Sequence, residues 1–193
     1  MPALACSHRS NDCGTAKLYK LLSDGRLQIT GFGQTGDFLG LAMSSTYAFS
    51  AEAITPVCVC RFSRRKLTVL LDDFPAMERR LLEVASNERV VAQAQMLLLG
   101  RKTARERVAS FLLAQRERAR ACYGLIETID LPMTGGDIAD HLGLTIETVG
   151  RTLTKLKKGG LIDLPNHSSV TLADDEGCRS WRKGVLGSGR RSI

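Results

Sequence analysis

Two side chains of opposite charge, Glu147 and Arg151, stand four residues apart in the segment LTIETVGRTLTKLKK. On a helix this spacing places both on one face. An arginine there can donate two hydrogen bonds to O6 and N7 of guanine, and a glutamate can accept one from N4 of cytosine. The same spacing is that of an ordinary surface ion pair, worth about 0.2–0.5 kcal/mol. The pair alone is compatible with both a DNA contact and a surface ion pair. The elements around it distinguish the two interpretations.

A short helix is predicted just before this segment, between Thr134 and Gly143. Thr134 and Asp137 are spaced as in a capping box, with Asp137 in place of the usual glutamate. An apolar stripe follows at helical spacing: Ile138, Ala139 and Leu142. Gly143 suits the left-handed position that ends many helices. Thr145 can then cap the helix that comes next.

The second helix is predicted to run from Ile146 to Lys158, where Gly159 and Gly160 stop it. Its apolar residues have helical spacing and are expected to face inward: Ile146, Val149, Leu153 and Leu156. The opposite face carries Glu147, Arg151, Thr154 and Lys158. Two capped helices joined by a glycine turn form a helix-turn-helix pattern, whose second helix enters the major groove of DNA.

This pattern predicts a set of contacts to double-stranded DNA. Base contacts are expected at Glu147, Gly150 and Arg151. Phosphate contacts are expected at Thr134, Thr145, Thr148, Thr154 and Lys155. Gly150 is unusual, because a glycine inside a helix costs about 0.5–1 kcal/mol relative to alanine. Its missing side chain removes one possible contact and lets the helix lie closer to DNA.

A long helix is predicted upstream, because no glycine or proline interrupts the chain between Pro75 and Leu99. Two heptad phases compete along it. One consists of Leu81, Val84, Glu88, Val91, Gln95 and Leu98. The other consists of Leu82, Ala85, Arg89, Ala92, Met96 and Leu99. Two apolar faces indicate a helix that packs on its own domain with one and on a second copy with the other, although a helix buried within one domain remains the alternative.

Strands are predicted on either side of these helices. The runs KLYKLLS and RLQITGF read as a hairpin around Asp24-Gly25, with further β-prone runs at TYAFSAEAIT and VCVCRF. A second strand pair is expected around 125–131 and 169–172.

Several of these motifs, in order along the chain, resemble one protein family. The segment DIADHLGLTIETVGR is similar to the helix-turn-helix of the CRP/FNR family, on its FNR/FixK branch. SDGRLQITGFGQTGDFLGL resembles that branch's β-roll hairpin, and MLLLGRKTARERVASFLL resembles its junction between the dimer helix and the DNA-binding domain. The resemblance covers about residues 16–172. It implies a homodimer that binds a palindromic site, recruits RNA polymerase and activates transcription, often of genes linked to oxygen or nitrogen fixation.

The resemblance also implies an α+β fold with three working parts. These are a partial, cupin-like sensory β-roll, a long dimerisation helix and a C-terminal winged helix-turn-helix. The expected boundaries are 1–15 for an atypical, disordered N-terminus, 16–72 for the roll, 73–100 for the dimerisation helix, 101–183 for the DNA-binding domain and 184–193 for a flexible tail. The match begins at a mid-roll strand, so the first part of the roll is expected to be missing, through a misplaced start or a truncation, which would leave sheet edges exposed.

No cofactor is expected in the roll. The family's nucleotide pocket uses an arginine for the phosphate, and the corresponding segment from Gly36 to Ser45 contains none. An iron–sulfur cluster needs four thiolates. Cys60 matches the family's roll cysteine, but the N-terminal region supplies only Cys6 and Cys13, at a different spacing. Cys58 could be a fourth thiolate, but at i+2 from Cys60 it would point to the other face of a strand.

Composition supports a globular protein with an anionic partner. The chain has a formal net charge of +7, with 44% hydrophobic residues, enough for a core. The first residues lack the apolar region of a signal peptide and no apolar run is long enough for a membrane span, so we expect a cytoplasmic protein. No nucleophile–base set, phosphate loop or zinc motif indicates an enzyme. The alternatives are an oxygen or redox sensor with an iron–sulfur cluster, and a truncated relative that dimerises but does not bind DNA alone.

Overall fold

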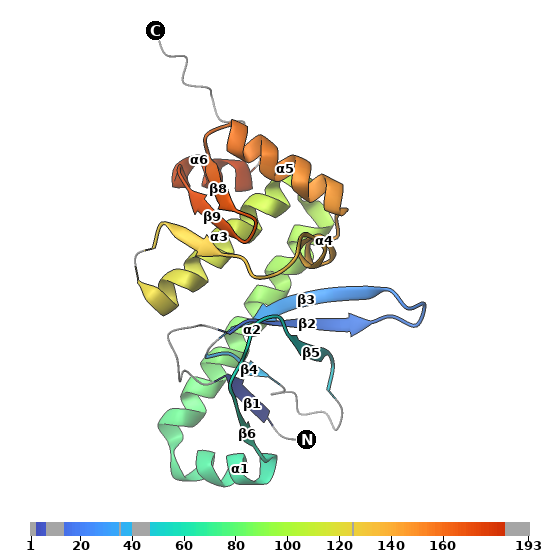
Figure 1. The fold of residues 1–193 in the computed structure, drawn as a ribbon. Helices are drawn as coiled ribbons and strands as arrows, with labels where there is room; N and C mark the ends of the chain where they lie inside the picture. The colour runs from blue at the N-terminus through green and yellow to red at the C-terminus, as the bar shows by residue number, and fades with distance from the viewer. Residues whose placement is uncertain (1–2, 7–13, 35, 40–46, 125, 184–193) are drawn as a thin grey trace. The chain divides into compact units, whose positions relative to one another are not determined.

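The computed structural model describes residues 3–6, 14–34, 36–39, 47–124 and 126–183. The chain divides into two compact units, residues 1–96 and 97–193. Strands dominate the first unit up to residue 62, and helices dominate the second (Figure 1). The α+β fold class predicted from the sequence is confirmed. Among the helices that the structure describes, none has the length and hydropathy needed to cross a bilayer.

The first unit consists of two antiparallel three-stranded sheets followed by helices. Its strands are β1 (Ala3–Cys6), β2 (Ala16–Leu21), β3 (Leu27–Gly33), β4 (Phe38–Leu39), β5 (Ser50–Ala53) and β6 (Val59–Phe62). Their order is β4-β1-β6 in one sheet and β3-β2-β5 in the other. The hydrophobic side chains described as buried here are Ala16, Ile29, Phe32, Leu39 and Leu67.

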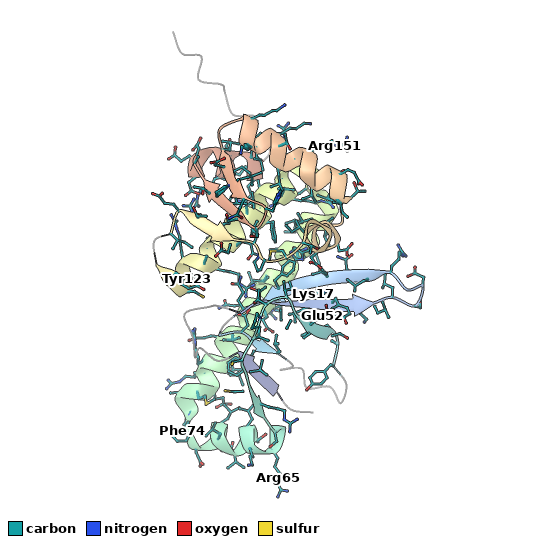
Figure 2. All side chains as sticks on the ribbon, viewed as in Figure 1. Lys17, Glu52, Arg65, Phe74, Tyr123 and Arg151 are labelled. Atoms are coloured by element: carbon teal, nitrogen blue, oxygen red, sulfur yellow. The ribbon has the colours of Figure 1, made fainter. Side chains whose placement is uncertain are left out.

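The predicted hairpin is present as β2 and β3. Gly25 has a φ of 83°, the left-handed conformation that the turn requires. The Asp24 carboxylate accepts hydrogen bonds from the Arg26 backbone N–H at 3.0 Å and from Arg26 Nε at 2.7 Å. Beside the hairpin, Lys17 of β2 pairs with Glu52 of β5 at 3.2 Å (Figure 2). The hairpin could be predicted from its sequence because the turn at Gly25 and the bonds of Asp24 involve only neighbouring residues.

The first residues differ from expectation. We expect residues 1–15 to lack regular structure, but Ala3–Cys6 forms β1. This strand lies between β4 and β6 and pairs antiparallel with both. Its register places Ala5 opposite Cys60 and Cys6 opposite Val59. Backbone pairing explains the correction, because β1 supplies hydrogen bonds to two strand edges that would otherwise lack a partner. Residues 7–13 and the predicted tail at 184–193 lie outside the described residues.

The long helical region is divided at Phe74. Helix α1 (Arg64–Asp73) ends there, and α2 (Pro75–Arg101) begins with proline, which suits the first turn of a helix. Helix α2 is 27 residues long. It therefore contains nearly all of the predicted dimerisation helix.

The second unit contains the helix-turn-helix. Its elements are α3 (Ala104–Tyr123), β7 (Thr128–Asp130), α4 (Gly135–Leu142), α5 (Ile146–Lys158), β8 (Ile162–Asn166), β9 (Ser169–Leu172) and α6 (Asp175–Arg182). The sheet order is β7-β9-β8, and the predicted pairing of β7 with β9 is present. Figure 1 shows α3, α4, α5 and α6 gathered around this small sheet. The core residues include Val108, Leu112, Ile129, Leu142, Val149, Leu156 and Val170.

Candidate nucleic-acid interface

Helix α4 begins with the predicted capping box. The Asp137 carboxylate accepts from the Thr134 N–H at 2.9 Å and from the Thr134 hydroxyl at 2.7 Å. The Thr134 hydroxyl in turn accepts from the Asp137 N–H at 3.1 Å. Aspartate therefore closes the box in place of glutamate, and the start of α4 is fixed by sequence-local bonds.

The turn between α4 and α5 is fixed at both ends. Gly143 lies in the left-handed region with φ 59° and ψ 46°. The Leu144 N–H donates to the Ala139 carbonyl at 2.9 Å, which satisfies one of the last carbonyls of α4. Thr145 then caps α5 by accepting from the Thr148 N–H at 3.3 Å. The turn thus sets the angle at which α5 leaves α4.

The inner face of α5 is largely as predicted. Val149 and Leu156 are buried, and Leu153 is partly buried. Ile146 is a correction, because 59% of its side chain is exposed. It is the first residue of the helix and extends beside the start of α4, where Gly135 and Gly136 offer no Cβ to cover it.

A buried threonine on this face escaped the sequence analysis. Thr152 is only 7% exposed, and its hydroxyl donates to the Thr148 carbonyl at 2.7 Å. A search for apolar residues alone could not find it. The hydrogen bond back to the preceding turn makes its burial possible.

The outer face of α5 carries Glu147 and Arg151, and both are exposed. Figure 2 marks Arg151 on this helix. Its Nη2 donates to the Thr148 hydroxyl at 3.3 Å, and the Thr148 and Thr145 hydroxyls are 3.1 Å apart. The pKa of Glu147 is held below its usual value by its own backbone N–H first, then by the Thr145 hydroxyl, with a smaller attraction from Arg151. Each charged group is therefore held chiefly by groups at the start of α5, and the electrostatic attraction between the two is the weaker influence.

Gly150 lies between these residues on the open side of the helix. No heavy atom lies within 4 Å of the position that a Cβ would take. The Gly150 carbonyl accepts a hydrogen bond from the Thr154 hydroxyl at 2.9 Å. Packing within the protein therefore does not explain a glycine at this position.

The remaining predicted contact residues surround the same face. Thr134 and Thr154 use their hydroxyls to donate within the protein. Lys155 is exposed near the C-terminal end of α5, and Lys157 pairs with Asp163 of β8 at 3.0 Å. The structure thus brings the predicted base contacts together on the first two turns of α5, with the threonines and Lys155 around them.

Helix α6 packs against α3, and the sequence analysis did not single it out. Asp175 Oδ2 accepts from Arg116 Nη2 of α3 at 2.9 Å, and the Arg116 side chain is only 8% exposed. The Arg105 guanidinium lies 4.3 Å from the ring centre of Trp181. The available signal was Asp174, which caps α6 by accepting from the Gly177 N–H at 2.9 Å.

Comparisons with known proteins match a different family to each of the two units. The Crp-like helix-turn-helix domain family matches residues 106–178, and the cyclic nucleotide-binding domain family matches residues 13–74. The nitrogen fixation regulation protein FixK of Bradyrhizobium diazoefficiens is 48% identical over 161 residues, which cover 83% of this chain and 68% of that protein. The chain belongs to the CRP/FNR family, on its FixK branch. It is a DNA-binding transcription regulator of the FNR/FixK type.

Other members of the CRP/FNR family agree with this assignment. The transcriptional activatory protein AadR of Rhodopseudomonas palustris is 51% identical over 149 residues, which cover 77% of this chain and 62% of that protein. The chain therefore spans 62% and 68% of these two CRP/FNR relatives. The solved structure of FixK2 from Bradyrhizobium japonicum has a TM-score of 0.83 and 34% identity, and the match covers 93% of this chain and 86% of that one.

Two cofactors known in the CRP/FNR family can be compared with the residues present. The segment expected to lack a phosphate-binding arginine falls largely on residues 40–46, outside the described residues. Cys58 and Cys60 are exposed in the first unit, whereas Cys178 is buried in the second. Within the described part of the chain, no three His, Cys, Asp or Glu side chains are grouped to hold a metal ion. Cys13 and the side chain of Cys6 lie outside what the structure describes, so the absence of a cofactor stays a prediction.

Proposed function

We propose that this regulator binds a palindromic DNA site as a homodimer, with one α5 helix in the major groove of each half-site. The observation that carries the proposal is the exposed pair of Glu147 and Arg151, held by threonine hydroxyls on the first turns of a helix whose other face is buried. A recognition helix contacts base edges with its N-terminal residues. The charged pair lies at that end of α5.

Each base contact follows from the chemistry of one side chain. Arg151 would donate two hydrogen bonds to O6 and N7 of a guanine, and Glu147 would accept from N4 of a cytosine. The lowered pKa of Glu147 supports this role, because only the carboxylate can accept with both oxygens. Gly150 would lie against the DNA between them, where the absent Cβ permits a close approach.

Phosphate contacts would hold this helix in register. Thr145 and Thr148 lie at the N-terminal end of α5, where helix amides favour anions. Lys155 offers an exposed ammonium group, which needs no rearrangement to meet a phosphate. Thr134 and Thr154 would need to turn their hydroxyls away from Asp137 and Gly150 to donate to a phosphate. We therefore expect Lys155 to contribute more than these two threonines.

The dimer would form through the exposed side of α2. In one heptad phase Leu81 and Val84 are partly buried and Leu98 is buried. In the other phase Leu82 and Met96 are 62% and 72% exposed. The second phase is thus available to a partner copy, and two copies joined there would match the symmetry of a palindrome.

We further propose that the dimer acts in the cytoplasm, activates RNA polymerase and needs neither a cyclic nucleotide nor an iron–sulfur cluster. The support is the FixK branch of the family together with the spacing of Cys6, Cys13 and Cys60, which differs in the sequence from that of a cluster site.

Replacing Arg151 with alanine tests the proposed base contact. The variant should lose about 1–3 kcal/mol of affinity for the specific palindrome, since it removes a two-bond contact to guanine. Affinity should be measured by fluorescence anisotropy at fixed salt, on the palindrome and on a scrambled duplex. Lys155→Ala is the matched control, because loss of a phosphate contact weakens both duplexes alike. If Arg151→Ala binds the palindrome as tightly as the parent, α5 does not recognise DNA in this way.

A further inference from the structure

Arg107 in the first turns of α3 donates four hydrogen bonds, and every acceptor is a backbone carbonyl. Its Nε donates to Lys102 O at 2.9 Å and its Nη2 to Leu99 O at 2.8 Å. Its Nη1 donates to Leu142 O at 2.8 Å and to Gly143 O at 3.2 Å. One guanidinium thus connects the end of α2 with the end of α4. We call this set of four bonds the Arg107 bracket.

The carbonyls at the end of α2 need this outside donor. In a continuing helix, the Leu99 carbonyl would accept from the Thr103 N–H, but that N–H donates to the Glu106 carboxylate at 2.6 Å. Likewise the Glu106 N–H, four residues after Lys102, donates to the Thr103 hydroxyl at 3.4 Å. The capping box of α3 therefore diverts the amides that α2 would use. Arg107 supplies the replacement donors.

The end of α4 has the same requirement. The left-handed turn at Gly143 satisfies the Ala139 carbonyl through the Leu144 N–H, and Arg107 serves the Leu142 and Gly143 carbonyls that follow. Carbonyls at a helix C-terminus carry partial negative charge, and a guanidinium beside them is favourable. The bracket places one cation between two such ends. Its flat array of five N–H donors makes this possible.

Side chains also pack closely where the last turn of α2 meets the end of α4. A Cβ on Gly143 would lie 3.3 Å from Leu99 Cδ2, closer than ordinary contact. Lys102 Nζ donates to the Ser110 hydroxyl of α3 at 2.7 Å. The compact second unit begins at Leu97, so the last turn of α2 belongs to it together with the helix-turn-helix.

We infer that Arg107 is a positioning residue for DNA recognition, which holds the helix-turn-helix at a fixed orientation on the last turn of α2. Arg107 itself contacts no base. This inference rests on the proposed homodimer and palindrome, because two copies joined along α2 would then present their α5 helices at one separation. The bracket would in this way determine which spacing between half-sites the protein accepts. A recognition helix held less firmly would accept several spacings with similar affinity.

The test measures affinity for a series of palindromes whose half-sites are identical and whose spacers differ by single base pairs. The full chain is compared with Arg107→Lys and Arg107→Gln. Lysine keeps the charge, but its single ammonium cannot reach carbonyls on both helices as the guanidinium does. Arg101→Gln is the matched control, because it removes a cation from the last turn of α2 and leaves the bracket intact.

The preference for the best spacer over its neighbours should fall at least about tenfold in both Arg107 variants, the ratio expected for losing one charge-assisted hydrogen bond. The parent and Arg101→Gln should keep the full preference. Circular dichroism and sedimentation should show folded dimers throughout, and the lysine variant decides alone if the glutamine variant does not fold.

Two results would overturn the inference, and they distinguish its failure from that of the proposed function. If affinity falls by one factor for every spacer and the preference is unchanged, Arg107 serves stability alone. If the parent binds none of the palindromes, the proposed function fails and the inference fails with it.

Discussion

At the scale of residues, the recognition face of α5 is arranged before DNA arrives. Thr148 accepts from Arg151, and Thr145 together with backbone N–H holds the Glu147 carboxylate. Side chains already held in place lose less conformational freedom on binding. The exposed charges of α5 are thus held in place by neighbouring hydroxyl groups, as the proposed base contacts would require.

Gly150→Ala should stabilise the protein. The added Cβ meets no atom within 4 Å, and alanine replaces glycine inside a helix, so the free energy of unfolding should rise by about 0.5–1 kcal/mol. Urea denaturation measures this rise. The same variant should bind DNA with an altered preference at the base beside the Glu147–Arg151 contacts, which a set of singly substituted palindromes would reveal.

Gly143→Ala provides the contrast. Its φ of 59° is unfavourable for alanine, so this variant should lose about 1–2 kcal/mol. A destabilised Gly150→Ala would contradict the open environment described for that position.

At the scale of elements, the sequence predicted what local interactions determine. The two caps and the glycine turn gave α4 and α5 their boundaries, because each bond joins residues close in sequence. Elements that depend on distant partners were missed. β1 exists through pairing with β4 and β6, and β8 contains Pro165, which argues against a strand.

In the candidate site, too, features that depend on local sequence could be predicted, and features that depend on distant residues could not. The outward position of Arg151 follows from helical periodicity alone. The exposure of Ile146 does not, since it depends on the two glycines at the start of α4. The Arg107 bracket could not be predicted either, because it joins residue 107 to carbonyls 35 and 36 residues away.

Helix α6 should make the second unit sensitive to alkaline pH. Cys178 is 1% exposed, and burial first, then Asp174 and Asp175, raise the pKa of its thiol from 9.0 to about 11. The folded state thus favours the neutral thiol. This contribution is complete below pH 9 and is lost as the pH rises towards 11. Between pH 8.5 and 10.5 the parent should lose about 1–2 kcal/mol more than Cys178→Ser, measured by urea denaturation. Parallel losses in the two proteins would show that the thiol does not titrate in this way.

At the scale of the whole molecule, α2 has an inner side and an exposed side. The sequence left two heptad phases open, and burial favours the second as the exposed one, since Leu81 and Val84 are partly covered while Leu82 and Met96 are exposed. Val91 is the exception in the first phase, because it is 67% exposed. Exposed apolar residues that recur along one side of a long helix favour a partner helix. The sequence could not make this choice, because it depends on which side of α2 the rest of the chain covers.

Leu82→Glu should therefore weaken the dimer, because it places a charge in the proposed apolar seam. Sedimentation equilibrium should show a rise in the dimer dissociation constant of at least about tenfold, equivalent to 1.4 kcal/mol. Asn87→Glu, an exposed position outside both phases, adds the same charge and should leave the dimer intact. Equal weakening by both substitutions would point to net charge and not to the seam.

The Arg107 bracket also has a consequence for how such proteins diverge. All four of its acceptors are main-chain oxygens, which every amino acid provides. Apart from Gly143, the residues whose carbonyls accept from Arg107 can therefore vary in type without loss of the Arg107 bracket. A gene segment that encodes the second unit, which contains the whole Arg107 bracket, can therefore be fused to a different sensor domain and dimer helix. The contacts between the last turn of α2 and the helix-turn-helix would be kept. Chimaeras whose crossover lies before Leu97 would keep the Arg107 bracket complete. A new sensor domain would then regulate the promoters that the original DNA-binding domain recognises.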